Sequence, residues 1–265
     1  MTGNNRRALH ALFLITLICS TLLITSHIFA TEKKMSATDV LNLVDRNLLK
    51  MEDSTYTVEL EVIRSKKVIK TMTFKVILKG LNKKHITFLA PGDLAGTAIV
   101  TTEDKVTYVY MPSYKKVRRV ASHVNNQGFM GTDVSGEELG TAALSKGWNG
   151  VILKETENSW VLNLSPEKNT ETTYAKMIVT VSKRYEGVER IESYNQDGKK
   201  VKTQVREEWK TFKDKSGATA VTMPTKFTYT DHLTGSQTRM TFLGCKVNQN
   251  IPDSLFTRRA LMRGK

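Results

Sequence analysis

The sequence predicts an α+β protein in which a strongly curved antiparallel sheet carries helices on its concave face. Apolar and polar residues alternate with period two through most of the chain, as they do in half-buried strands. Turn-forming residues, for example at 195–198 and 214–217, separate the alternating runs. Long helices do not intervene, so the strands are expected to form a meander. A sheet with one apolar face must then curl or be covered.

Two helices are predicted to provide that cover. The first spans residues 40–51, where apolar residues recur at helical spacing, and alternating apolar residues of the sheet, such as Met72, Phe74 and Val76, are expected to face it. Ser36 can cap it, and Asp39 suits the positive end of the helix dipole. A second, short helix is predicted at Ser135, because Glu138 three residues later completes a capping box.

Thirteen strands account for most of the remaining chain. Residues 56–62 and 72–78 alternate most clearly, and a turn at 65–67 joins them. The other strands are expected at residues 86–89, 97–102, 106–111, 115–120, 151–154, 160–164, 176–181, 188–194, 201–209, 226–230 and 238–247. No internal repeat or linker separates them, so residues 31–265 are expected to form a single domain.

Residues 1–30 have the order of a secretory signal peptide. Arg6 and Arg7 precede an apolar run over residues 8–23, and Ala30 offers a small residue at the cleavage point. Ile28 fits the minus-three position poorly, which leaves an uncleaved membrane anchor as the alternative. Cleavage would give an exported, periplasmic protein.

The charge of the chain points toward an anionic partner. Loss of Arg6 and Arg7 lowers the net charge from +14 to +12. For an exported protein, this excess suits anionic lipid headgroups or an acidic partner better than nucleic acid. A plainly solvated surface is the alternative. Cys245 remains as the single cysteine after cleavage, and a buried, inert thiol is expected there.

The motifs of common enzymes and metal sites are absent. The three histidines that remain after cleavage have no metal-ligand spacing, and the chain lacks GxSxG, HExxH, CxxC and Walker-type runs. Asp133, Glu137 and Glu138 form the one carboxylate cluster, which helix capping explains without catalysis. We therefore expect no enzyme activity, no cofactor and no metal.

The segment over residues 108–139 combines aromatic, basic and acidic residues. In a strand at 115–120, Arg118 and Arg119 point to opposite faces, so one of them points inward. An inward arginine needs a carboxylate or an anionic ligand, because a bare buried charge costs several kcal/mol. Asp133 and Glu138 are the nearest candidates, and together the four residues would form a charged gate. A solvated rim of the sheet is the alternative.

An apolar pair in the same segment is a candidate lid. Gly128 and Gly131 flank Phe129 and Met130, which suits a mobile flap over apolar cargo, with ordinary core packing as the alternative. The residues predicted to line an apolar cavity or its lid are Met72, Phe74, Tyr108, Tyr110, Met111, Phe129, Met130 and Leu139.

Four stretches resemble a known family. They are "PGDLAGTA", "YVYMPSYKKVRRV", "GFMGTDVSGEEL" and "DSLFTRRALMRG", within residues 91–264. Together they are similar to the outer membrane lipoprotein-sorting proteins, the LolA-like periplasmic group. The resemblance implies an unclosed β-barrel of the LolA/LolB type, with helices over a hydrophobic cavity that receives acyl chains. It also implies work beside inner-membrane transporters of the resistance-nodulation-division type.

These observations predict a carrier without enzyme activity. It would shield lipid or lipoprotein acyl chains between the inner and outer membranes, touch membranes transiently and act as a monomer. The alternative is an accessory or sensor subunit of an inner-membrane transporter that carries nothing. A hydrolase of envelope lipids has no motif in its support.

Overall fold

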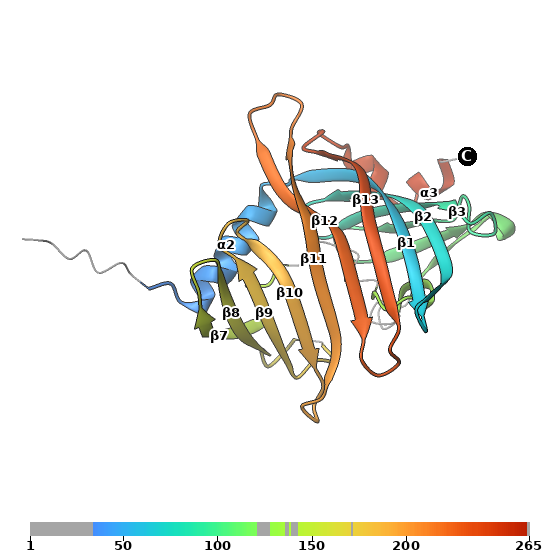
Figure 1. Ribbon diagram of the computed structural model, residues 1–265. Helices are drawn as coiled ribbons and strands as arrows, with labels where there is room; N and C mark the ends of the chain where they lie inside the picture. The colour runs from blue at the N-terminus through green and yellow to red at the C-terminus, as the bar shows by residue number, and fades with distance from the viewer. Residues whose placement is uncertain (1–33, 121–127, 136–137, 139–142, 171, 264–265) are drawn as a thin grey trace, which may run out of the picture. The chain divides into compact units, whose positions relative to one another are not determined.

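One antiparallel sheet dominates the computed structural model, which describes residues 34–120, 128–135, 138, 143–170 and 172–263 (Figure 1). The fold is that of the unit Met35–Lys265. The predicted signal peptide lies outside the described residues. In the described part of the chain, the sheet has thirteen strands, one for each predicted strand. They are β1 (Asp53–Arg64), β2 (Lys67–Lys79), β3 (Lys83–Ala90), β4 (Ala98–Thr101), β5 (Thr107–Met111), β6 (Lys116–Arg119), β7 (Trp148–Glu155), β8 (Ser159–Pro166), β9 (Lys176–Ser182), β10 (Gly187–Tyr194), β11 (Lys200–Lys213), β12 (Ala220–Asp231) and β13 (Gln237–Val247).

The sheet is unclosed. Its strand order is β6-β5-β4-β3-β2-β1-β13-β12-β11-β10-β9-β8-β7, so β6 and β7 are the two edges. Most strands pair with the next strand in the chain, and β1 pairs with β13. The connection from β6 to β7 joins these two edges, and its described residues pack on the first core and line the pocket described below. We call its described parts, residues 128–135, 138 and 143–147, the crossing segment.

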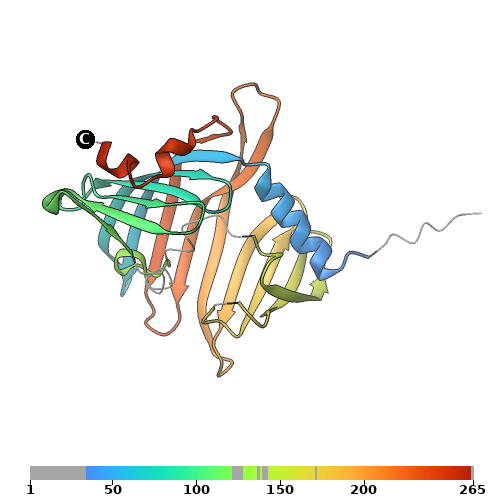
Figure 2. The same cartoon turned by 180° about the vertical axis from the view of Figure 1, so that it is seen from behind.

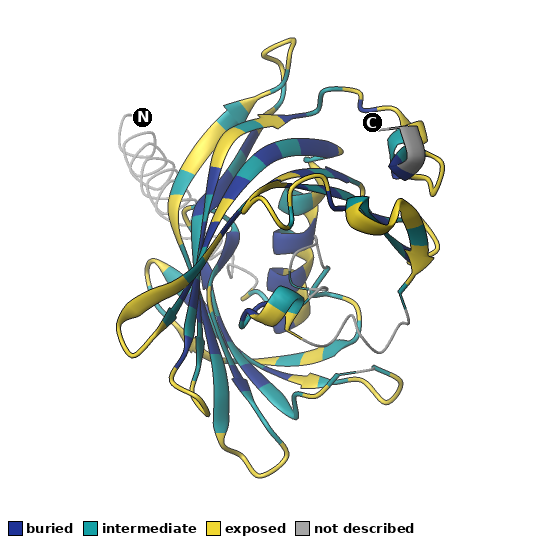
Figure 3. Cartoon of the chain, turned by 90° about the vertical axis from the view of Figure 1, so that its right-hand side faces the viewer, coloured by how far each residue is buried: buried dark blue, intermediate teal, exposed yellow. Residues whose placement is uncertain are grey.

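Helix α2 (Ala37–Leu49) begins as the sequence predicts. Ser36 caps it, and a capping box forms because Asp39 Oδ2 accepts a hydrogen bond from Ser36 N at 2.9 Å while Ser36 Oγ accepts one from Asp39 N at 3.1 Å. The helix lies against the concave side of the sheet (Figures 2 and 3). Gly150 in β7 permits this approach, because a Cβ there would lie 3.2 Å from Cβ of Ala37.

Two separate apolar clusters fill the concave side. The first core lies on β1–β3, β12 and β13, and part of the crossing segment packs on it. The second core joins β7–β10 to α2. Met72, Phe74 and Val76, which we expected to face the first helix, belong to the first core instead. The correction has a topological reason: α2 contacts β7 and β10, several strands away from β2 in the sheet.

The C-terminal residues cover a different part of the sheet. Two short elements, η4 (Asp253–Phe256) and α3 (Ala260–Arg263), contact β3, β4 and β5. Leu261 packs there with Ala98 and Val100 in a third, smaller cluster. Two further 3₁₀ turns, η1 (Pro112–Tyr114) and η3 (Phe129–Gly131), lie in connections. Among the described residues, no helix has the length and apolar character needed to span a bilayer.

Candidate ligand-binding pocket

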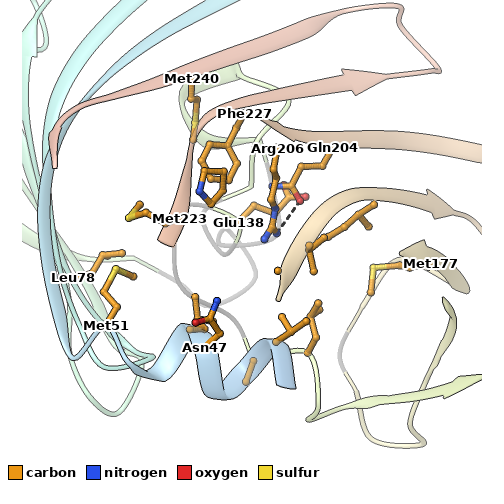
Figure 4. Close-up of a pocket in the computed structure, with 18 of the residues that line it drawn as sticks. Asn47, Met51, Leu78, Glu138, Met177, Gln204, Arg206, Met223, Phe227 and Met240 are labelled. Atoms are coloured by element: carbon orange, nitrogen blue, oxygen red, sulfur yellow. Dashed lines mark hydrogen bonds between the residues drawn. The ribbon is translucent and has the colours of Figure 1, made fainter. Parts of the chain in front are cut away.

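A pocket of about 510 Å³ lies where the two cores meet (Figure 4). Its walls come from the end of α2, from β1 and β2, from β9–β13, and from the crossing segment. Small-molecule pockets typically measure about 300–1,000 Å³. We call this site the junction pocket.

Methionine and aromatic side chains make up much of the pocket wall. Four of the ten methionines in the chain line it: Met51, Met177, Met223 and Met240. Methionine side chains are flexible and adapt to irregular apolar shapes. The other apolar residues of the lining include Leu48, Val58, Val76, Leu78, Val188, Ile191, Phe227 and Phe242. The wall is therefore suited to alkyl chains of variable form.

Strand β11 gives the pocket a polar corner. Successive residues of a strand point to opposite faces, so Lys202, Gln204 and Arg206 share one face. That face points inward, because Gln204 pairs with Tyr229 and Arg206 with Phe227 in the neighbouring strand, and both partners belong to the first core. All three β11 residues line the pocket.

Glu138 neutralises Lys202 at this corner. The Nζ atom of Lys202 lies 2.9 Å and 3.2 Å from the two carboxylate oxygens of Glu138. Burial alone would lower the pKa of Lys202, but the charge of Glu138 raises the pKa above its ordinary value. Ser135 N donates to Glu138 Oε2 at 2.7 Å, and Glu138 N donates to Ser135 Oγ at 3.2 Å. The predicted capping-box contacts are present and orient this carboxylate, although the residues that would continue the helix lie outside the described part of the chain.

Arg206 has no such partner. Its Nη2 donates one hydrogen bond, to Gln204 Oε1 at 3.2 Å, and its guanidinium lies 5.8 Å from the ring centre of Phe227. Gln204 in turn donates to the hydroxyl of Tyr229 at 2.7 Å. The Nε atom of Arg206 is buried without a hydrogen-bond partner among the described residues. Burial lowers the pKa of this guanidinium, although the nearby charge of Glu138 opposes the effect.

The predicted lid pair packs on the first core. The ring of Phe129 lies 5.8 Å from Phe88 and 6.1 Å from Phe74, measured between ring centres. Met130 packs on the same core, and its carbonyl accepts a hydrogen bond from Lys70 at 2.8 Å. Core packing, the alternative interpretation, therefore describes the contacts of both side chains.

The predicted pairing of the two strand arginines is wrong. Asp133 Oδ2 accepts a hydrogen bond from Thr238 Oγ1 at 2.8 Å, its Oδ1 accepts one from Ser236, and Glu138 pairs with Lys202. Arg118 and Arg119 are exposed on β6, and neither forms an ion pair with a described carboxylate. The physical reason is that β6 is an edge strand, where both faces can reach water, so the solvated-rim alternative holds.

The other residues predicted for the site lie apart from the junction pocket. Tyr108 and Tyr110 pack with Leu261 in the C-terminal cluster, and Met111 is half-buried at the end of β5. Met72 and Phe74 are in the first core, and Leu139 lies outside the described residues. Glu138 is the predicted site residue that lines the pocket.

The polar corner on β11 was not predicted. In the run "VKTQVREEW", Val201, Thr203 and Val205 alternate with the three polar residues. A half-buried strand normally turns its apolar face inward, so the pattern indicates the opposite orientation to the one observed. One feature of the sequence could have indicated the polar corner. Lys202, Gln204 and Arg206 recur at period two, and a nearby strand carries aromatic residues at 227 and 229 on one face.

The class of fold follows from this architecture and from known structures. A DUF1329 family protein from Desulfovibrio piger superposes with a TM-score of 0.73 at 21% identity, covering 84% of this chain and 97% of the other. A putative outer membrane lipoprotein-sorting protein domain from Vibrio parahaemolyticus gives 0.72 at 20% identity, covering 84% and 98%. A LolA superfamily protein from Nitrosomonas europaea gives 0.67 at 18% identity, covering 85% and 99%. The chain has the unclosed, curved sheet of the LolA-like fold, which confirms the resemblance read from the sequence.

The family follows from the sequence itself. A family model described as "Uncharacterized protein" matches residues 80–263, which is more than half of the chain. The protein belongs to that family. No curated protein matches the chain.

Proposed function

We propose that the protein is a periplasmic carrier that shields the acyl chains of lipids or lipoproteins in the junction pocket and moves them between the inner and outer membranes. The observation that carries this proposal is the pocket itself, with its volume of about 510 Å³ and its lining of methionine and aromatic side chains. The LolA-like fold supports the same function, because it places such a pocket inside a half-closed sheet.

Apolar burial is the main source of binding free energy for this function. Each buried methylene contributes about 0.8 kcal/mol, so ten of them contribute about 8 kcal/mol. Association costs about 4–15 kcal/mol in lost freedom of motion. At the lower end of that cost, ten methylenes leave about 4 kcal/mol for binding, a Kd of about 1 mM, and each further methylene adds about 0.8 kcal/mol. An acyl chain with more buried methylenes therefore binds more tightly, and a carrier that must release its cargo needs no more than moderate affinity.

The hairpin of β1 and β2 provides a surface for contact with anionic membranes. Its tip turns at Ser65 and Lys66, and it carries Arg64, Lys66, Lys67 and Lys70 with no acidic residue between them. Val68 and Ile69 beside the turn are 51% and 54% exposed. Basic residues near an anionic membrane contribute about 1 kcal/mol each. A carrier that collects cargo from a bilayer would use such a tip to approach it.

Lipid extraction and probe binding test the proposal together. Protein purified from its host should carry lipid that mass spectrometry identifies, and the delipidated protein should bind a fluorescent acyl probe. Met223→Glu places a charge in the pocket wall and should abolish probe binding. Val151→Glu is the matched control, because Val151 is 58% exposed on β7 and does not line the pocket.

The same experiment separates the carrier from its alternative. Protein without lipid and without probe affinity would contradict the carrier function. That result would favour the accessory or sensor subunit of an inner-membrane transporter.

A further inference from the structure

The charges at the polar corner of the junction pocket do not balance. Lys202 and Glu138 form a pair 2.9 Å apart, with side chains only 17% and 24% exposed. Arg206 lies on the same face of the same strand, four residues further along. Glu138 is the described acid that lines the pocket at this corner, and its two oxygens already accept from Lys202. Asp231 lies opposite Lys202 in β12, but its carboxylate accepts from the amides of Leu233 and Thr234. One cationic charge is therefore left without a bonded counter-charge.

The wider lining repeats this excess. The described residues that line the pocket include four basic side chains, Lys105, Lys146, Lys202 and Arg206, and two acidic ones, Glu138 and Glu186. Lys105 and Lys146 are exposed, so their charges are solvated, whereas Arg206 is half-buried and its guanidinium extends into the pocket (Figure 4). A buried charge without a partner costs several kcal/mol. The presence of the Arg206 charge in the pocket wall therefore needs an explanation.

A structural role accounts for Arg206 poorly. A guanidinium has five N–H donors, and among the described residues only one hydrogen bond leaves it, to Gln204. The side-chain amide of Gln204 donates a hydrogen bond to the hydroxyl of Tyr229. Neither Gln204 nor Tyr229 therefore needs the positive charge of Arg206. Phe227 supports the guanidinium face without neutralising its charge. Nε is buried, and because Arg206 lines the junction pocket, its Nη groups are the donors that a ligand there can reach.

We propose that Arg206 receives the head group of the ligand, which is an amphiphile with an acyl chain and an anionic oxygen head, either a carboxylate or a phosphate. This inference rests on the carrier function proposed above and specifies the chemistry of its cargo. The planar guanidinium matches two oxygens of either head through parallel hydrogen bonds. The chain then runs along the methionine wall, from Met223 and Met240 toward Met51.

Matched probes with one chain length test the head group. Binding of palmitate, hexadecyl phosphate and hexadecanol to the delipidated protein is measured by displacement of a fluorescent acyl probe. Palmitate, hexadecyl phosphate or both should bind about tenfold to a hundredfold more tightly than hexadecanol, as expected for hydrogen bonds to a charged group. The tighter of the two anions identifies a fatty-acid or a phospholipid head.

Substitutions at Arg206 then assign the preference to this side chain. In Arg206→Met the preference should disappear while hexadecanol affinity stays unchanged, and Arg206→Lys should retain part of it. Arg190→Gln is the control, because Arg190 is an exposed arginine of the same sheet that pairs with Glu192 at 2.8 Å. Without ligand, Arg206→Met should melt no lower than the wild type, since it removes a half-buried charge that has no ion-pair partner.

The outcomes separate this inference from the function on which it rests. Equal affinity for hexadecanol and both anions would overturn the head-group role and leave the carrier function intact. A lower melting temperature with equal loss for all three probes would make Arg206 a structural residue. Failure of every probe to bind would overturn the carrier function together with the inference.

Discussion

The two halves of the concave face are covered by different kinds of structure. Over β7–β10, α2 supplies a continuous apolar stripe that includes Val40, Leu41 and Val44. Over β1–β3 and β13, the crossing segment supplies separate anchors: the Phe129 ring on Phe88, and Asp133 on Thr238. A helix presents its apolar residues at regular spacing, whereas an irregular segment is held only where a side chain or hydrogen bond fixes it. The junction pocket lies where these two covers meet.

The crossing segment also ties the two covers together. Beyond Glu138, the amides of Leu144 and Ser145 donate to the carboxylate of Asp45 in α2, at 2.9 Å and 2.7 Å. The chain thus runs from the first core, past Lys202 in β11, to the helix of the second core. Loosening either cover would therefore change the pocket wall, but by different amounts.

The largest effect is expected from the helix. Leu41→Ala should lower the free energy of unfolding by about 2–5 kcal/mol, because Leu41 is 2% exposed in the second core. Leu49→Ala is the control on the same helix, and it should change the stability by less than about 0.5 kcal/mol since Leu49 is 52% exposed. Urea unfolding measures both. Equal losses for the two variants would mean that the helix is not docked by its apolar stripe.

A smaller effect is expected from the crossing segment. Phe129→Ala should cost about 1–3 kcal/mol, less than a fully buried phenylalanine, because its ring is only partly buried. Tyr114→Ala, at a ring 64% exposed in η1, is the matched control in urea unfolding. Phe129 does not line the junction pocket, so affinity for an acyl probe should change by less than about twofold. A large loss of affinity would restore the lid interpretation of this segment.

The halves differed in how far the sequence could predict them. Period-two alternation predicted all thirteen strands, and the Ser36–Asp39 capping box predicted α2, because these signals are local. The pocket is not local: Met51, Lys202 and Met223 meet there from distant parts of the chain. The face of β11 that points inward carries Lys202 and Arg206. The pattern within that strand alone does not indicate that this polar face is the one turned toward the pocket.

The other wrong predictions of site residues are explained by where their strands lie in the sheet. The sequence predicts an inward role for either Arg118 or Arg119, because a strand must turn one of them in, but β6 is an edge where neither faces a sealed core. Tyr108 and Tyr110 face the C-terminal helix α3, far along the chain, whose packing site no local pattern specifies.

The proposed membrane contact predicts a difference between the surfaces of the two halves. Val68→Ser with Ile69→Ser should weaken binding to phosphatidylglycerol vesicles about tenfold, or about 1.4 kcal/mol, because the hairpin of β1 and β2 loses its apolar tip. Val151→Ser with Leu153→Ser on β7 is the control, since those side chains are 58% and 56% exposed without a basic cluster beside them. Vesicle co-sedimentation measures both. If both double variants bound the vesicles equally weakly, the hairpin would have no special role in membrane binding.

The smallest effect is a dependence on pH at the C-terminal cover of the sheet. His85 in β3 donates from Nδ1 to the carbonyl of Leu255 at 3.0 Å, which ties η4 to the sheet. Burial lowers the pKa of His85 below 6.5, the hydrogen bond to Leu255 opposes this shift, and the charge of Lys75 adds to it. The unfolded chain therefore takes up the proton first as the pH falls through about 6.5, so acid favours unfolding.

His85→Gln should remove this dependence while its amide can still donate to Leu255. Between pH 7.5 and pH 5.5, the wild type should lose more unfolding free energy than the variant, by about 1 kcal/mol or less per pH unit. Urea unfolding at the two pH values measures the difference, and the other histidines and the carboxylates cancel in the comparison. If His85 were solvated in the folded protein, the wild type and the variant would lose the same unfolding free energy between the two pH values. Any pH response of the C-terminal cover would then come from other groups.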